Sequence, residues 1–311
     1  MRRLITLLFA ALFCLSGLNA RPKPVRIVMA TYNLRYINRD DSIAGNGWTQ
    51  RCPWMARLIY AHGFEIFGTQ EGFKRQLEDL KTLLPNYDYI GLGREDGKEA
   101  GEHSAIFYRT DLFKVIDHGD FWLSETPDRP SLGWDAACIR ICTWGHFKHI
   151  KSGQEFLFFS LHMDHVGKRA RSESTRLVME KMNEFGDKLP AILVGDFNVD
   201  QNSDEYREIV ESGVFNDAYK AARFRYAPNG TFNDFKPAGY TSSRIDHIFL
   251  SPSIKVDKYA ILTDTYRTRP KDQVDPPVNP YSIRVLPYIS RTPSDHYPVR
   301  IEVLLSGKRK D

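Results

Sequence analysis

Cysteine is scarce in this 311-residue chain, which also lacks a Gly/Ser-rich linker, a low-complexity tract and an internal repeat. Only four cysteines occur, one of them near the N-terminus. The other three, Cys52, Cys138 and Cys142, are an odd number, which argues against a disulfide framework. On a predicted strand, Cys138 and Cys142 would also lie roughly 13 Å apart, too far for a disulfide. Because no linker divides the chain, we expect residues 21–311 to form one domain.

The chain has little excess of charge of either sign. Its formal net charge is +4, and this falls to +2 (41 basic against 39 acidic residues) when Arg2 and Arg3 are left out. A protein that coats a nucleic-acid backbone carries a much larger positive excess, so that class is excluded. Any contact with a polyanion should be confined to a local patch.

Beyond residues 1–20, no amphipathic stretch typical of membrane binding is present. Those 20 residues have the order of a secretory signal: Arg2 and Arg3, an apolar centre over 4–15, and the small residue Ala20 at the expected cleavage point. The apolar centre is short for a membrane span. We therefore predict a secreted or periplasmic protein without stable membrane insertion after cleavage. An uncleaved anchor and a lipoprotein are the alternatives.

Short apolar runs predict buried strands. These runs cover residues 25–32, 64–68, 104–108, 155–161, 191–194, 245–250 and 299–305. Helical spacing of apolar residues predicts amphipathic helices over 73–84 and 170–185. Several strands follow one another without a helix, so we expect an α/β (α+β) fold with a mainly antiparallel core of two packed sheets. Residues 264–293 show no strong periodicity and predict a long loop.

Polar side chains that can hold metals or protons follow many of these predicted strands. Ionised carboxylates are costly inside a sheet and much less costly at its rim, so such groups can converge where strands end. One acid, Asp246, lies between Ile245 and His247-Ile248 and therefore needs a partner. The candidates in chain order are Asn33, Glu71, His162, Asp196, Asn198, Asp246, Asp295 and His296.

Oxygen ligands are frequent in this set. Asn33, Glu71, Asp196, Asn198 and Asp295 suit Mg²⁺ or Mn²⁺, which proteins hold with one or two carboxylates plus water and substrate phosphate. Zinc prefers a compact group of His or Cys ligands. Four histidines keep zinc open as an alternative: His162, His165, His247 and His296. The Gly-Asn-His-Asp pattern of dinuclear metallophosphatases is absent from the sequence.

The histidines could act on a phosphoester together with the metal. Hydrolysis needs an activated water and stabilisation of charge on the phosphoryl oxygens. A histidine or a metal can activate water at neutral pH, and Asp246 could hold His296 in one tautomer. Structural roles are also open, because Asn33 and Asn198 could be turn residues and Glu71 could cap the helix that follows it.

The ordered series resembles the endonuclease/exonuclease/phosphatase superfamily, over residues 25 to about 305. Members include pancreatic-type deoxyribonucleases, inositol polyphosphate phosphatases, neutral sphingomyelinases and nocturnin-type deadenylases. Trp48 and Arg51 at the start of a helix, and the segment 133–137 leading into Arg140, are similar to a secreted bacterial branch.

This resemblance implies a four-layer αββα sandwich, in which two mixed sheets are flanked by helices. It also implies a Mg²⁺- or Mn²⁺-dependent phosphoesterase that holds its metal through Glu71, with Asn33 and Asp295 close by. We expect such an enzyme to act as a monomer.

The resemblance further implies how the remaining residues share the chemistry. Asp196 and Asn198 would position or activate the attacking water, and His162 would contact the phosphoryl group. His296, paired with Asp246, would act as general base or as an electrostatic clamp. The choice between Asp196 and His296 as the base stays open.

The substrate is the least determined expectation. A nuclease-like phosphodiesterase, similar to a 3′–5′ exoribonuclease, is favoured because Arg140 could contact phosphate and Trp134 could stack on a base. The alternatives are a sugar- or inositol-phosphate phosphatase, a sphingomyelinase-type phospholipase and a non-catalytic binding module. A local basic rim could include Arg267, Arg269, Lys271 and Arg291. Exposed aromatics for a phospholipase could be Tyr266, Tyr281 and Tyr288.

Overall fold

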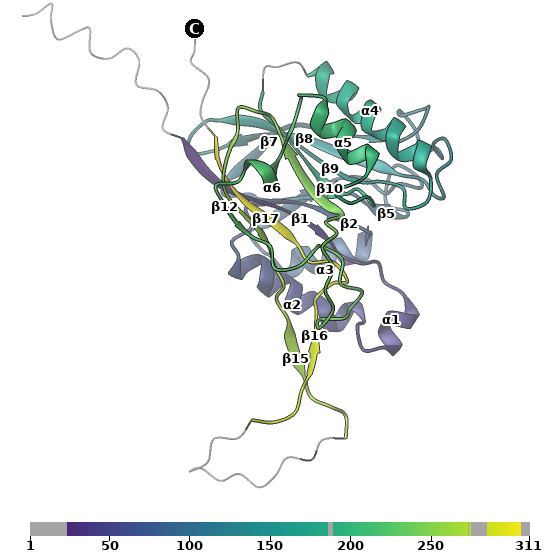
Figure 1. Ribbon diagram of the computed structural model, residues 1–311, viewed down its shortest axis with the longest axis vertical. Helices are drawn as coiled ribbons and strands as arrows, with labels where there is room; N and C mark the ends of the chain where they lie inside the picture. The colour runs from purple at the N-terminus through teal and green to yellow at the C-terminus, as the bar shows by residue number, and fades with distance from the viewer. Residues whose placement is uncertain (1–23, 186–188, 273, 275–284, 306–311) are drawn as a thin grey trace, which may run out of the picture.

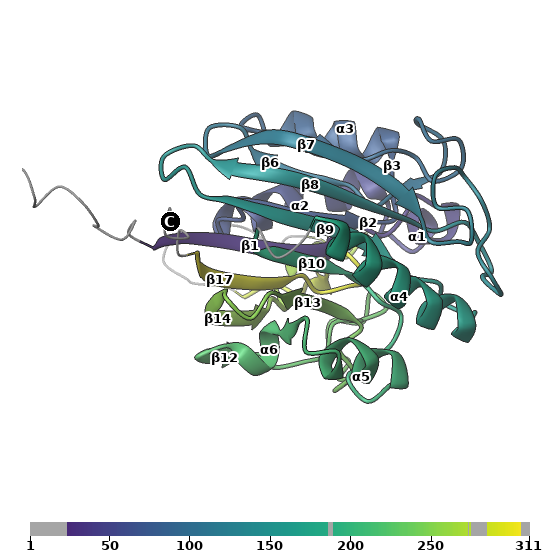
Figure 2. The ribbon, with the colours of Figure 1, turned by 90° about the horizontal axis from the view of Figure 1, so that it is seen from above.

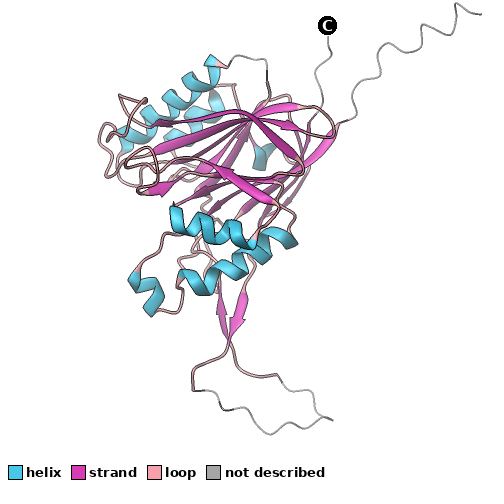
Figure 3. Ribbon diagram, turned by 180° about the vertical axis from the view of Figure 1, so that it is seen from behind, coloured by secondary structure: helices cyan, strands magenta, loops and turns pink. Residues whose placement is uncertain are grey.

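Two large β-sheets pack face to face, and helices cover the outer face of each (Figure 1; Figure 3). The computed structural model describes residues 24–185, 189–272, 274 and 285–305. The expected signal segment lies outside the described residues. One pair of covering helices is α2 (Trp48–Ala61) and α3 (Lys74–Leu83), and the other is α4 (Lys168–Glu184) and α5 (Asp204–Glu211). The αββα sandwich is thereby confirmed.

The first sheet has seven strands and is mixed. Its order is β12 (Phe224–Tyr226), β14 (Lys255–Ile261), β17 (Val299–Leu305), β1 (Val25–Asn33), β2 (Ile66–Gln70), β6 (Ile106–Arg109) and β4 (Tyr87–Ile90). The pairs β1–β2 and β12–β14 are parallel, and the other pairs are antiparallel. The last strand of the chain, β17, therefore lies between β14 and β1 inside the sheet (Figure 2).

The second sheet has six strands. Its order is β11 (Asn216–Asp217), β13 (Asp246–Leu250), β10 (Ala191–Asp196), β9 (Glu155–His162), β8 (Ile141–His149) and β7 (Phe113–Trp122). Only β9 and β10 run parallel among these pairs. Smaller elements are α1 (Arg39–Ile43), α6 (Ala218–Ala221), and the two-stranded ribbons β3–β5 (Gly72–Phe73 with Glu102–His103) and β15–β16 (Tyr266–Thr268 with Ile289–Arg291).

The alternation of side chains along the central strands explains the layers. In β1, Ile27 and Met29 belong to the core between the two sheets, whereas Ala30 and Tyr32 belong to the core under α2 and α3. Successive side chains of a strand point to opposite faces, so a strand buried on both faces is apolar throughout. Next to the site the sheets approach closely at Gly68, where a Cβ would clash with Val194 and Ser160.

The prediction of a long loop over residues 264–293 is wrong at both ends of that segment. These ends pair as the ribbon β15–β16, which projects from the body of the molecule (Figure 1). Tyr266 is buried and its ring stacks on Trp54 at a centroid distance of 5.1 Å, so it is not an exposed aromatic. Arg291 donates to Thr268 Oγ1, Ala44 O and Asn46 Oδ1, which ties it to the body instead of a free basic rim. The candidate Tyr281 lies outside the described residues.

Two further predictions can be compared with the structure. Cys52, Cys138 and Cys142 are free thiols, as the odd cysteine count suggested. In the described part of the chain, no helix has the length and apolar character needed to cross a membrane.

A buried arginine joins the segment that follows β1 to the segment that precedes β17. Arg51 of α2 is completely buried, and its guanidinium donates to Leu34 O (2.9 Å), Pro293 O (2.8 Å), Arg35 O (3.1 Å) and Asn46 O (2.7 Å). Four carbonyl groups that no helix or sheet satisfies are thereby bonded. Arg51 fixes the loop after β1 against the segment that precedes β17.

We expect Arg51→Met to lower the free energy of unfolding by about 3 kcal/mol or more, because the Leu34, Asn46 and Pro293 carbonyls lose this donor, whereas Arg35 O still accepts from Gln76 Nε2. Urea denaturation followed by circular dichroism measures the change. The control is Arg57→Met, an exposed arginine on the same helix, which should cost less than about 1 kcal/mol. Equal losses for the two variants would show that the buried hydrogen bonds add little.

Candidate active site

A cavity of about 520 Å³ opens at the rim where β2, β9 and β10 end. Of the predicted residues, Glu71, Asp196, Asn198, Asp295 and the two histidines His162 and His296 line it, together with Arg140. Asn33 and Asp246 are buried directly behind these lining residues. The remaining lining residues are Arg35, Tyr36, Arg94, Glu102, Cys138, His165, Phe232 and Ile245.

Neighbouring strand ends bring three of the predicted residues together. In the second sheet, Asp196 is paired in register with His162 on one side and with Asp246 on the other. In the first sheet, Glu71 follows β2 directly and has a φ of +63°, a left-handed conformation that is uncommon outside glycine. The cap of α3 is Phe73, so the alternative that Glu71 caps this helix is wrong.

The amide of Asn33 joins carboxylates that come from both sheets. Its Nδ2 donates to Glu71 Oε1 and to Asp196 Oδ2, at 3.0 Å in each case. Its Oδ1 accepts from Arg35 N at 2.9 Å, and Glu71 Oε2 accepts from Tyr36 N at 3.1 Å. Two carboxylates on one amide repel each other, and a divalent cation beside them would relieve that repulsion.

The donor set beside this amide fits a divalent cation. One ligand atom each from Glu71, Asp196 and His296 lies within 4.8 Å of the others. Two carboxylates with waters and substrate phosphate are what Mg²⁺ or Mn²⁺ requires. Asp295 lines the same cavity, but its Oδ2 lies 3.5 Å from Arg35 Nη1 and it does not belong to this trio.

A second trio, Cys138, Asp164 and His165, does not suit a metal equally well. Arg140 already lies between two of its members, with Nε 3.3 Å from Asp164 Oδ1 and Nη2 3.0 Å from His165 Nδ1. The Asp164 carboxylate also accepts from the backbone N–H groups of Val166 and Gly167. A cation would have to displace the guanidinium, so the zinc alternative has little support here.

His296 is held by the predicted partner. Its Nδ1 lies 2.9 Å from Asp246 Oδ2, and its Nε2 lies 3.7 Å from Asp196 Oδ2. Burial lowers the pKa of His296, but the charges of Asp246 and Asp196 outweigh burial and hold this pKa well above its usual value. Burial and the charge of Asp246 raise the pKa of Asp196 to about 7.

His162 is held in a neutral state on the other side of Asp196. The amide nitrogen of Asn198 donates to Met163 O at 2.9 Å and lies 3.0 Å from His162 Nε2, so Nε2 acts as acceptor and the proton resides on Nδ1. Burial, followed by the positive charges of Arg140 and Arg94, holds the pKa of His162 well below its usual value. Asn198 is also the turn residue that was the alternative, because its N–H donates to Asp196 Oδ1.

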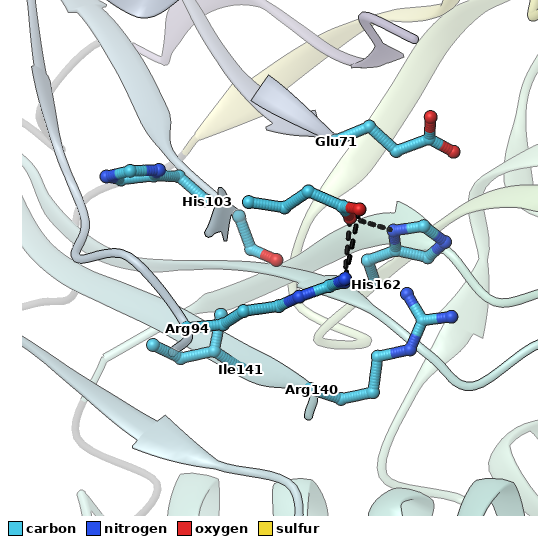
Figure 4. Close-up of a pocket in the computed structure, with 8 residues that line it drawn as sticks. Glu71, Arg94, His103, Arg140, Ile141 and His162 are labelled. Atoms are coloured by element: carbon cyan, nitrogen blue, oxygen red, sulfur yellow. Dashed lines mark hydrogen bonds and ion pairs between the residues drawn. The ribbon is translucent and has the colours of Figure 1, made fainter. Parts of the chain in front are cut away.

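Sequence reasoning missed three charged residues of the cavity: Arg35, Arg94 and Glu102. Arg94 donates to both oxygens of Glu102, at 2.7 and 3.0 Å, and Glu102 Oε2 lies 3.8 Å from His162 Nδ1. Figure 4 shows Arg94 and Arg140 reaching toward His162 from one side, with Glu71 on the other. Arg94 lies in a glycine-rich turn and gave no apolar pattern or motif that could identify it.

A family model for the endonuclease/exonuclease/phosphatase family matches residues 30–296. The chain belongs to this family. It is 56% identical to a crystal structure of a family member from Bacteroides thetaiotaomicron, with a TM-score of 0.85 and coverage of 91% of this chain and 98% of that one. Because its members hydrolyse phosphoester bonds, the protein is a hydrolase of this class, and the acids and histidines of the cavity fit the divalent metal that the family uses.

Two other solved structures differ in how similar their sequences are to this chain. A mannosyl-6-phosphatase of B. thetaiotaomicron is 56% identical, with a TM-score of 0.84 and coverage of 90% of this chain and all of that one. The human nocturnin catalytic domain has a TM-score of 0.64 at 17% identity, covers 92% of this chain and 96% of that one, and shares the fold. One uncharacterised mimivirus protein is 32% identical over 49% of this chain, which spans 60% of that relative. A second uncharacterised mimivirus protein is 21% identical over 83% of this chain, which spans 43% of that relative.

We expect Asp246→Asn to lower kcat by about 100-fold or more, because a neutral amide neither fixes the His296 tautomer nor supports its positive charge. Steady-state kinetics on a phosphomonoester measure the change. The matched control is Asp264→Asn, which breaks the exposed His62–Asp264 contact of 3.0 Å and should leave kcat unchanged. A similar kcat for both variants would contradict a role for the buried pair.

We expect Glu71→Gln to weaken Mn²⁺ binding by about tenfold or more, because it removes one of the two carboxylate charges of the trio. Isothermal titration calorimetry on the free protein measures this affinity without reference to activity. Glu78→Gln, at an exposed position on α3, serves as control and should bind Mn²⁺ like the wild type. Unchanged affinity in Glu71→Gln would place the metal elsewhere.

Proposed function

We propose that this protein is a secreted, monomeric, Mg²⁺- or Mn²⁺-dependent phosphomonoesterase that releases phosphate from a sugar 6-phosphate. The observation that carries this proposal is the pairing of every arginine among the described residues that line the cavity. Arg35 faces Asp41 at 2.8 Å, and Arg94 is paired with both oxygens of Glu102. Arg140 faces Asp164 at 3.3 Å.

A wall of paired charges is suited to a neutral polar ligand. Nucleic-acid backbones are bound by cations that are free to neutralise successive phosphates, and here each guanidinium already has a carboxylate. A monosaccharide needs one anion site for its phosphate and neutral hydrogen-bonding groups for its hydroxyls. The mannosyl-6-phosphatase with 56% identity over nearly the whole chain supports the same choice.

The residues around the trio have consistent roles in such a reaction. Glu71 would hold the metal together with Asp196 or His296, whichever of the two does not take the proton, with Asn33 orienting the two carboxylates and Asp295 close by. When bound, the metal would neutralise phosphoryl oxygens and lower the pKa of water.

Proton transfer and charge stabilisation would fall to the residues beside that metal site. Asp196, oriented through the Asn198 N–H, or His296, held by Asp246, would take the proton of the attacking water. His162, whose Nε2 lies 3.7 Å from Asp196 Oδ2, would contact the phosphoryl group.

The nuclease favoured by the sequence has less support. Trp134, the predicted stacking residue, is not among the residues that line the cavity. Its backbone N–H donates to Glu125 Oε2 at 3.0 Å, and the φ of Trp134 itself is +43°. The likeness to nocturnin concerns the fold alone, because the identity is 17%.

In assays with Mg²⁺ or Mn²⁺, we expect kcat/KM for mannose 6-phosphate to exceed that for bis-p-nitrophenyl phosphate by about 100-fold or more. Single-stranded RNA is the third substrate, and released phosphate and shortened RNA are the readouts. Asp196→Asn is the control for contaminating activity, because it removes a carboxylate of the trio. Faster cleavage of RNA than of mannose 6-phosphate would favour the nuclease and exclude the proposal.

A further inference from the structure

One charged pair of the cavity has no part in the metal trio. Arg94 and Glu102 line the cavity with side chains only 13% and 15% exposed. The backbone fixes Arg94 firmly, since its N–H donates to Glu102 O at 3.0 Å and its carbonyl accepts from Trp122 Nε1 at 2.7 Å. The pair is thus a rigid feature of the wall.

The pair retains hydrogen-bonding capacity toward the cavity. Two N–H groups of Arg94 bind Glu102, out of the five that a guanidinium carries. A carboxylate offers about four lone-pair sites, of which two receive these bonds. A ligand hydroxyl can therefore donate to Glu102 while its neighbour accepts from Arg94. A phosphate placed at the same point would be repelled by the Glu102 carboxylate.

The Arg94–Glu102 pair and the metal trio line the same cavity. The imidazole ring of His162 lies between Glu102 and Asp196. Its Nδ1 is 3.8 Å from Glu102 Oε2, and its Nε2 is 3.7 Å from Asp196 Oδ2. Because both places line one cavity of about 520 Å³, a sugar whose 6-phosphate lies at the trio would extend along the cavity wall toward the pair.

We propose that Arg94 and Glu102 form the sugar subsite, binding two adjacent ring hydroxyls remote from the phosphate. This inference rests on the proposed function. The subsite distinguishes sugar 6-phosphates from phosphomonoesters without hydroxyls, and it discriminates among sugars that differ at these positions. Arg94 and Glu102 bind the sugar, whereas the trio holds the metal.

The test uses three substrates with wild type and Arg94→Met: mannose 6-phosphate, 2-deoxyglucose 6-phosphate, which lacks one ring hydroxyl, and phenyl phosphate, which has none. We expect Arg94→Met to lower kcat/KM for mannose 6-phosphate by about 10- to 100-fold, mainly through KM. The loss should be smaller for 2-deoxyglucose 6-phosphate and smallest for phenyl phosphate, for which only the effect of Arg94 on the pKa of His162 remains. Arg94→Lys should lie between wild type and Arg94→Met.

Retained activity on phenyl phosphate shows that the variant is folded and its reaction centre intact. Lys98→Met, an exposed cation in the same segment, is the matched control and should behave like wild type on all three substrates. Equal losses on mannose 6-phosphate and phenyl phosphate, or no loss on either, would overturn the subsite. If the wild type itself shows no preference for mannose 6-phosphate over phenyl phosphate, the proposed function fails instead.

Discussion

The site depends on one amide shared by two carboxylates from different sheets. Asn33 ends a strand of the first sheet, and its side chain donates both to Glu71 beside it and to Asp196 at the end of a strand in the second sheet. The separation of these acids is therefore set by how the two sheets pack. Gly68 permits that packing, because any larger side chain would push β2 away from the second sheet.

Two histidines flank Asp196 in opposite electrostatic states. His296 faces carboxylates, which raise its pKa, whereas His162 faces arginines and an amide donor, which together with burial lower its pKa. One imidazole is thus suited to carry positive charge and the other to remain neutral with its proton on Nδ1. This asymmetry follows from the neighbours that each strand end supplies, since both rings are nearly completely buried.

Much of this arrangement follows from local sequence. Apolar runs located the strands that carry the site, and the apolar neighbours of Asp246 required a partner that the structure supplies in His296, 50 residues away. The Arg94–Glu102 pair could not be found in this way, because it joins polar residues of a turn that only the folded chain brings to the cavity. Trp134 was expected at the cavity because its segment leads into Arg140 and resembles that of the family, but it is not among the residues that line the cavity.

Because β17 is the last strand in the sequence but lies inside the first sheet, this sheet is completed late in folding. The strand that follows Asp295 and His296 inserts between β14 and β1, and Arg51 clamps Pro293 to the segment that follows β1. Pairing of sequence-distant strands is slow compared with local folding. A chain in which residues 293–305 are not yet in place therefore lacks both a central strand of its first sheet and two residues of its cavity, so hydrolytic competence requires the insertion of β17.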